Sequence, residues 1–375
     1  TLTGADSYWN GNTITSWSPN KPSDEELKVT SLKVALNKGA TWTPTVVENS
    51  EPKDQQYTAL NKLTLDGGIV DVNKDVAITI ENIDGKGAIT NAGSVTIEKG
   101  TIEGPITFEK GDAEADNMVK VDKDGITTLT GGVTGSGTID KLAIDKDGKT
   151  TITNAKLSGH EGRALWNEGT LTVTGGRFES NKANVAGAIY NADGATLTVD
   201  GVTFASNSSV NNVAGAINNR DGQVTIKKST FTGNDSGTKA GGAIYNASGN
   251  LSTLGAITIA GSTFEGNKAG NGGAVWNGSD GKVDIADSTF KGNMALAKGG
   301  LGQGGAITNA DQMTITGGSF ANNTAKYSGG AIYNGAHAAP GQTSLMIDGT
   351  TFTGNSVTAD FSTTNNDKIA GGAIF

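Results

Sequence analysis

The sequence predicts an all-β fold, a right-handed single-stranded parallel β-helix with three short strands in each coil. A Phe-x-x-Asn motif occurs seven times in the second half, at spacings of 26 to 33 residues. An Ala-apolar-x-Asn segment precedes each motif, and an apolar-x-apolar segment lies between the two. A period of this length is typical of stacked structural repeats, and the alternation is typical of half-buried strands.

The first element of each repeat is the Ala segment, which ends in asparagine. It reads ALWN at Ala164, AIYN at Ala188, AINN at Ala216, AIYN at Ala243, AVWN at Ala274, AITN at Ala306 and AIYN at Ala331. We expect the terminal asparagines to form an in-register amide ladder that satisfies the backbone of the turns. Strict strand alternation would bury only one of the two adjacent apolar residues, so a corner or bulge is expected there.

The second and third elements are separated by a corner of constant length. The last apolar residue of the second segment precedes the repeat Phe by five residues in every copy, as in Val173 to Phe178 and Ile259 to Phe264. The other two corners vary in length and therefore accept insertions. We expect the phenylalanines to form one internal column, because each coil must bury the apolar face of its neighbour.

The chain divides into three parts of one continuous solenoid. We expect an N-terminal cap and irregular first coils over residues 1–60, divergent coils over 61–156, and regular coils over 157–375. The last repeat is incomplete, at Gly371 to Phe375, and a terminal coil normally needs a polar cap. The sequence is therefore expected to be a C-terminally truncated fragment.

Composition argues against several functional classes. The net charge is −9 and only three arginines occur, which disfavours nucleic acid as a partner. With no cysteine and two histidines, neither a zinc site nor a cysteine nucleophile is expected, and no cofactor is predicted. His160 faintly resembles the Gly-His-Gly segment of pectin-hydrolysing β-helices, but no paired aspartates accompany it. We therefore predict that the protein is not an enzyme.

One outward strand position carries aromatic residues in five repeats: Trp166, Tyr190, Tyr245, Trp276 and Tyr333. Asn218 and Thr308 interrupt this column, and polar residues there imply exposure. Exposed rings on a rigid surface could stack on sugars or bind a protein. Alternatively, the rings could cover their own strands and insertion loops. These five residues, with His337 in a neighbouring insertion, are the candidate ligand-binding residues.

The motifs resemble those of a known family. GGAIYN at Gly241 and Gly329, GGAVWN at Gly272 and GGAITN at Gly304, paired with Phe-x-x-Asn, resemble polymorphic outer-membrane proteins and related type V autotransporter passengers. The resemblance covers about residues 160–375. It implies a passenger at the bacterial cell surface or secreted, attached to the membrane only through a C-terminal β-barrel absent from this sequence. It also implies a role in adhesion, self-association or biofilm formation.

Three functional hypotheses follow. The first is an adhesin that binds a host glycan, glycosaminoglycans included, or an extracellular-matrix protein such as fibronectin, through its side face and insertion loops. The second is self-association, in which polar ladders of two β-helices pair. The third, a polysaccharide-active enzyme, is disfavoured because no carboxylate cluster is visible. Long insertions would obstruct flat pairing and build grooves instead, which favours the first hypothesis.

Overall fold

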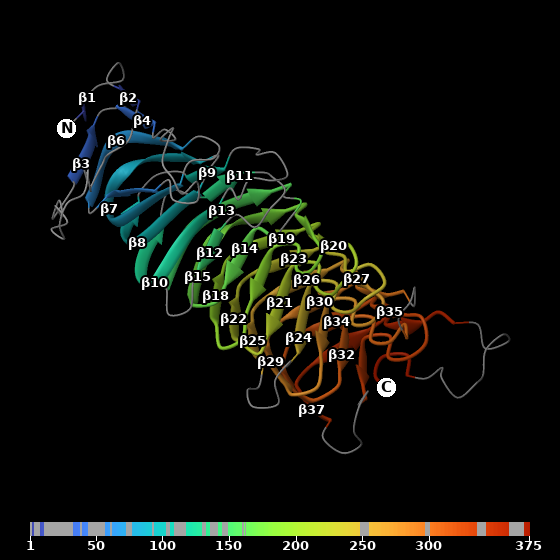
Figure 1. Cartoon of the computed structure of the whole chain (residues 1–375). Helices are drawn as coiled ribbons and strands as arrows, with labels where there is room; N and C mark the ends of the chain where they lie inside the picture. The colour runs from blue at the N-terminus through green and yellow to red at the C-terminus, as the bar shows by residue number, and fades with distance from the viewer. Residues whose placement is uncertain are drawn as a thin grey trace, which may run out of the picture.

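A computed structural model shows an elongated rod of stacked coils with the two termini at opposite ends (Figure 1). It describes residues 2–3, 8–10, 33–37, 40–43, 57–60, 62–72, 77–91, 94–102, 106–108, 118–129, 133–135, 142–144, 149–159, 161, 163–247, 255–296, 301–335, 343–359 and 371–375. The fold is a right-handed parallel β-helix, as the sequence predicts, and the described residues include no helix. Accordingly, this part of the chain offers no helical segment with the length and apolar character of a membrane span.

Three columns of strands build the regular coils, and every strand pairs in parallel with its equivalents in the adjacent coils. The Ala segments form β14 (Leu165–Asn167), β17 (Ile189–Asn191), β21 (Ile217–Arg220), β24 (Ile244–Ala247), β28 (Val275–Asn277), β32 (Ile307–Asn309) and β36 (Ile332–Asn334). The second segments form β18 (Thr196–Asp200), β22 (Gln223–Lys227), β25 (Gly255–Ala260), β29 (Gly281–Ala286), β33 (Gln312–Thr316) and β37 (Ser344–Asp348). The Phe segments form β19 (Thr203–Ala205), β23 (Thr230–Thr232), β26 (Thr263–Glu265), β30 (Thr289–Lys291), β34 (Ser319–Ala321) and β38 (Thr351–Thr353). In two earlier coils the second segment and the Phe-column segment form one continuous strand, β13 (Lys149–Ser158) and β15 (Thr170–Glu179).

A fourth, very short strand, which the repeat pattern does not predict, follows the Phe-x-x-Asn corner. It pairs only with its equivalents, so it adds a narrow ladder beside the three main columns. Its members are β16 (Lys182–Ala183), β20 (Ser208–Ser209), β27 (Lys268–Ala269), β31 (Met294–Ala295), β35 (Thr324–Ala325) and β39 (Ser356–Val357).

The N-terminal strands follow the same parallel stacking. Leu2 pairs with Leu36, and Trp9 pairs with Trp42, whose side chain is fully buried. The boundaries at residues 60 and 156 stay predictions. These strands are β1 (Leu2–Thr3), β2 (Tyr8–Asn10), β3 (Lys33–Asn37), β4 (Thr41–Thr43), β5 (Tyr57–Leu60), β6 (Lys62–Val72), β7 (Ala77–Asn91), β8 (Ser94–Ile102), β9 (Ile106–Phe108), β10 (Met118–Leu129), β11 (Val133–Gly135) and β12 (Leu142–Ile144).

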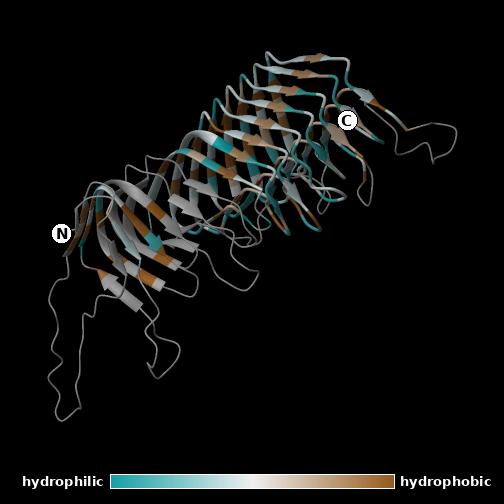
Figure 2. Cartoon of the chain, turned by 90° about the horizontal axis from the view of Figure 1, so that it is seen from above, coloured by the Kyte–Doolittle hydropathy of each residue, from teal (hydrophilic) through white to brown (hydrophobic). Residues whose placement is uncertain are grey.

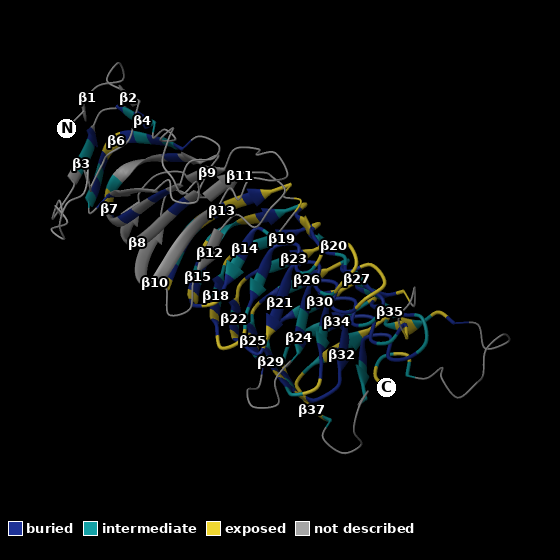
Figure 3. Ribbon diagram, viewed as in Figure 1, coloured by how far each residue is buried: buried dark blue, intermediate teal, exposed yellow. Residues whose placement is uncertain are grey.

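The core is a set of ladders of like side chains that run along the rod axis. Phe178, Phe204, Phe231, Phe264, Phe290 and Phe320 are buried, and Phe352 is half-buried against them. Adjacent rings lie with centroids 4.7 to 5.1 Å apart and stack nearly parallel. Figure 2 shows the apolar positions repeating from coil to coil, and Figure 3 shows the buried interior they make. The predicted internal Phe column is confirmed.

The corner of constant length turns at a residue with left-handed backbone. This residue stands three positions before each Phe, and φ there lies between 46° and 67° in every regular coil. Five of the seven are glycine, while Lys228 and Asp287 adopt the same conformation. A turn made by one such residue has no room for an insertion, because an added residue would shift the Phe off its ladder.

Close approach of the coils explains the second glycine of the GGAI motif. A Cβ added to Gly242, Gly273 or Gly305 would lie 2.0 to 2.1 Å from the carbonyl oxygen of the glycine in the next coil. The first glycine has positive φ, for example 68° at Gly241. The motif is therefore a constraint of the backbone rather than a binding signature.

The expected bulge between the Ala and Ile columns is present. The backbone amides of Ala243 and Ile244 both donate to the carbonyl oxygen of Ala274, at 2.9 Å each. One carbonyl thus faces two residues, as in a bulge, and both side chains turn inward. Ala243 and Ile244 are accordingly fully buried.

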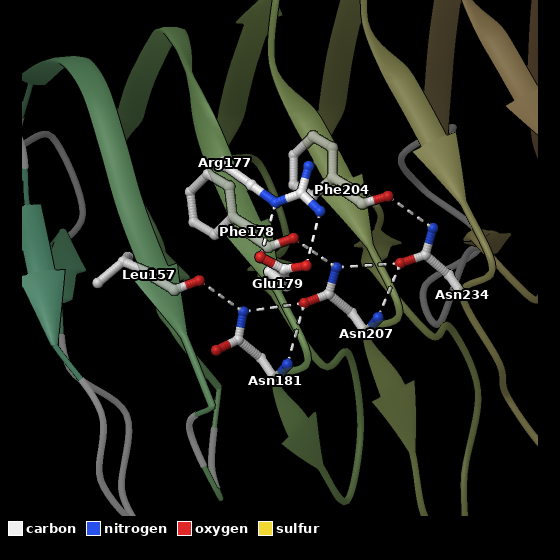
Figure 4. Close-up of polar contacts among 8 residues, drawn as sticks. All are labelled: Leu157, Arg177, Phe178, Glu179, Asn181, Phe204, Asn207 and Asn234. Carbon is white, nitrogen blue, oxygen red and sulfur yellow. Dashed lines mark hydrogen bonds and ion pairs between the residues drawn. The ribbon is translucent and has the colours of Figure 1, made fainter.

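Two asparagine ladders run along the corners. The side-chain amide of each Asn at the end of an Ala strand donates to the side-chain oxygen of the next at 2.7 to 2.8 Å, from Asn167 to Asn334. The Phe-x-x-Asn asparagines form a second ladder at 2.9 to 3.0 Å, and each also donates to the carbonyl oxygen of a Phe or Leu (Figure 4). The interpretation of these residues as turn staples is confirmed.

Candidate functional site

The aromatic column predicted from the sequence is formed on the outer side of the Ala strands. Strand register places Trp166, Tyr190, Tyr245, Trp276 and Tyr333 at one position of successive coils, with Asn218 and Thr308 in line. The register follows from the Ile and Asn residues on either side, which are buried and locked in their own ladders. The strand register therefore fixes the position of each ring along the column.

The rings stack in pairs rather than standing alone. The centroids of Trp166 and Tyr190 lie 4.7 Å apart with an interplanar angle of 21°, and those of Tyr245 and Trp276 lie 4.5 Å apart at 6°. Tyr333 stacks on Phe375 at 5.2 Å. All five column rings are half-buried. The rings therefore cover one another and still reach the surface, and their binding of a ligand stays a prediction.

The inference that the polar breaks imply exposure is wrong. Asn218 is 5% exposed and Thr308 is fully buried. A short side chain between two levels of large rings is shielded by them, so its polarity does not report on solvent access. The Thr308 hydroxyl donates to the carbonyl oxygen of Gln303 at 2.8 Å, whereas the Asn218 side-chain oxygen has no partner.

Two of the three arginines lie on this column, which sequence reasoning missed. The Arg163 guanidinium lies over the Trp166 ring at 4.2 Å from its centroid and 5.2 Å from that of Tyr190. Arg220, two residues after Asn218 on β21, forms a side-chain hydrogen bond with Tyr190. For Arg220 a signal was available in the sequence, since arginine is rare in this chain and residues i and i+2 of a strand, here Asn218 and Arg220, share a face.

The electrostatics of the column mix both signs of charge. The hydrogen bond to Tyr190 raises the pKa of Arg220, and the nearby Asp221 and Asp193 carboxylates add to this effect. Burial raises the pKa of the Tyr245 hydroxyl, and the Arg220 charge partly opposes the rise. The Trp166 indole N–H donates to a Glu168 carboxylate oxygen at 2.9 Å. The face thus offers rings, hydrogen-bond donors and acceptors within a few coils.

The two histidines and most of the insertion residues fall outside the description of the structure. His337, the sixth candidate ligand-binding residue, and His160 lie outside the described residues. So do residues 248–254, 297–300, 336–342 and 360–370, which belong to insertions at the two corners of variable length, expected over Ala247 to Gly255, Met294 to Gln303, Gly335 to Thr343 and Ser356 to Ala370. Their part in ligand binding stays a prediction.

The described residues show no arrangement that suggests metal-dependent chemistry. No group of three or more His, Asp or Glu side chains that could hold a metal ion occurs among them. The ion pairs that link Arg177 with Glu179 and Lys291 with Glu265 are exposed surface pairs, at 2.6 and 2.8 Å. Arg177 lowers the pKa of the Glu179 carboxyl, as expected of a charge-assisted hydrogen bond on the surface.

Comparison with protein families finds the Chlamydia polymorphic membrane protein repeat at residues 261–278 and 317–335. Each matched segment runs from a Phe strand through the second asparagine ladder and the GGA corner to an Ala strand, and includes Trp276 or Tyr333. The resemblance drawn from the GGAI and Phe-x-x-Asn motifs is confirmed. Searches of curated proteins and of solved structures find no match.

Proposed function

We propose that this chain is the β-helical passenger of a bacterial surface adhesin, and that its ligand contacts the outward aromatic column. The matched repeats come from a family of membrane proteins, which supports a cell-surface location and a non-enzymatic role. The host ligand is a glycan or an extracellular-matrix protein. The observation that carries the proposal is a line of half-buried, pre-stacked rings on a rigid scaffold.

The physical support comes from rigidity and amphipathic contact area. Tyr and Trp present large rings whose polar ends remain available to hydrogen-bond, and they lose little conformational entropy on binding. Here the stacking partner and the buried strand beneath each ring already fix its orientation.

The proposal is tested by adhesion of a Trp276→Ala, Tyr333→Ala double variant. We expect binding of purified protein to host cells to fall by about tenfold or more, because two ring contacts are removed. Tyr245 and Phe375 each lose a stacking partner worth about 0.5–1.5 kcal/mol, so the thermal midpoint falls only slightly. Thr258→Ala, on the outer side of the second strand column, is the matched control and should bind as the wild type does. Unchanged adhesion of the double variant would contradict the proposal.

Self-association is the second candidate. Its support is an outward threonine column in register through Thr172, Thr198, Thr225 and Thr258, a flat polar surface that a second copy could pair with. Sedimentation at rising concentration tests it. A Thr225→Lys variant that abolishes a concentration-dependent dimer would favour this candidate, and a monomer at all concentrations would remove it.

A further inference from the structure

We infer that the outer face of the Phe strands pairs with the same face of a second copy of this chain, with the two rods antiparallel about a two-fold axis between Glu265 and Lys291. The inference goes beyond the adhesin proposal, because the aromatic column lies on the Ala strands and stays open in such a dimer. For self-association it names a face other than the threonine column. Along the rod, β19, β23, β26, β30 and β34 follow one another, and β38 pairs with β34 (Figure 1).

This face is smooth because both corners that border it have constant length. On one side, the left-handed turn residue stands three positions before each Phe. On the other side, the ladder Asn stands three positions after it. Both variable corners adjoin the Ala strands instead, so the insertions leave the chain away from the Phe strands. A second rod can therefore approach this face as closely as two packed sheets do, with about 10 Å between their backbones.

Outside its centre the face is neutral and rich in hydroxyl groups. Strand register holds the outward residues in two straight rows, one on either side of the buried Phe column. The first row is Thr203, Thr230, Thr263, Thr289, Ser319 and Thr351, and the second row contains Ala205, Thr232, Ala321 and Thr353 in the four outer strands. Pairing of these rows therefore brings no like charges together.

The two charged residues of the face stand at its centre, with two further strands on either side. Glu265 on β26 and Lys291 on β30 are cross-strand neighbours, and their carboxylate and ammonium groups lie 2.8 Å apart with both side chains about half-exposed. A two-fold axis midway between them and parallel to the strands reverses the order of the coils and keeps each strand position. Glu265 then lies opposite the partner's Lys291, and Lys291 opposite the partner's Glu265. The four charges alternate in sign, which fixes the register of the pair.

The corner charges fit the same arrangement. Lys228 and Asp287 are exposed at the corner that precedes the Phe strands, in the coils of β23 and β30. The axis brings the partner's Asp287 to the level of β26, one coil spacing of roughly 4.8 Å from the level of Lys228. A parallel pair would instead place Glu265 opposite the partner's Thr263, without an ion pair between the copies. The charges therefore favour the antiparallel pair.

The size of the face predicts a weak dimer. Six strands extend about 29 Å along the rod and, with the two corners, about 17 Å across it, which gives roughly 500 Å² on each copy. A stable interface of standard size buries about 800 Å² on each partner. We therefore expect dimers only at high protein concentration, and fewer of them at high salt because the central charges are exposed.

Sedimentation velocity at rising protein concentration tests the pairing with two charge reversals, Glu265→Lys and Lys291→Glu. Each variant alone places like charges opposite each other at both central contacts, so its dimer dissociation constant should rise about tenfold or more. An equimolar mixture of the two variants restores opposite charges at both contacts and should dimerise. Glu179→Lys is the matched control, because Glu179 has the same strand position and an exposed ion pair with Arg177 but lies one coil beyond the paired face. It should dimerise within about twofold of wild type.

Thermal unfolding of each variant establishes that it is folded, and recovery in the mixture separates a lost contact from a folding defect. A wild type that stays monomeric at every concentration overturns the inference, as do single variants that dimerise normally or a mixture that stays monomeric. Loss of the dimer in Thr225→Lys with an intact dimer in Glu265→Lys moves the contact to the threonine column and also overturns it. Adhesion of Trp276→Ala with Tyr333→Ala is read separately, so the adhesin proposal and the dimer can fail independently.

Discussion

Replacing Phe264 with alanine removes a ring from the middle of the internal stack. Phe264 is fully buried, and its centroid lies 4.7 Å from those of Phe231 and Phe290, at interplanar angles of 2° and 3°. Loss of a buried phenylalanine costs about 3–5 kcal/mol through lost burial and the cavity left behind. Rigid ladders on both sides prevent collapse of the cavity, so we expect the upper end of this range.

Denaturant unfolding measures this cost, and Phe264→Leu is the matched control. Leucine keeps most of the buried volume but loses both stacking contacts, so we expect it to cost less than half as much as alanine. Hydrogen exchange should also accelerate in β23 and β30, because neighbouring coils in a solenoid share their stability. A cost below about 1 kcal/mol for Phe264→Ala, with exchange unchanged in those strands, would refute the ladder as the main source of stability.

Further predictions concern the corners and the column. Asn234→Ala should cost about 3 kcal/mol in denaturant unfolding, because the Phe204 carbonyl and the Asn207 amides lose a buried partner; a cost near zero would contradict the ladder account. Gly242→Ala should cost about 3 kcal/mol or more through overlap with the next coil, whereas Gly237→Ala, with open space around its Cβ, should cost about 1 kcal/mol; equal costs would contradict the close-approach argument. Because burial raises the pKa of Tyr245 in the folded state, its contribution to stability is present below the ordinary tyrosine pKa of about 10 and is lost as the pH rises through the folded value. Unfolding curves from pH 8 to 11 should therefore show a smaller alkaline loss for Tyr245→Phe than for wild type, and identical losses would count against this linkage.

The regular coils were predictable because stacking turns each repeat position into a ladder. A Phe in one coil must stack on a Phe in the next, so the period, the constant corner and the Asn columns all appear directly in the sequence. The narrow ladder at Lys268–Ala269 was missed because two-residue strands carry no alternation to detect. The pairing of Trp9 with Trp42 was missed because two coils are too few to reveal a repeat.

The candidate site was predictable only as a column. Position within a repeat placed the five aromatic residues on one face, but not how their rings pair or where the two arginines lie. Those features depend on side-chain directions across neighbouring coils. Exposure was misjudged at Asn218 and Thr308 because burial at a column position is decided by the size of the side chains one coil away, not by the polarity of the residue itself.

Hydroxyl-radical footprinting of the column tests the central claim most directly, because it oxidises aromatic and methionine side chains according to their solvent access. The protein is labelled alone and with a mixture of oligosaccharides released from host-cell surfaces. We expect the ligand to protect Tyr190, Tyr245 and Trp276, while Met346, 66% exposed on the second strand column, is oxidised equally in both samples. Protection of Met346 with unchanged labelling of the column rings would contradict the assignment of this face as the binding surface.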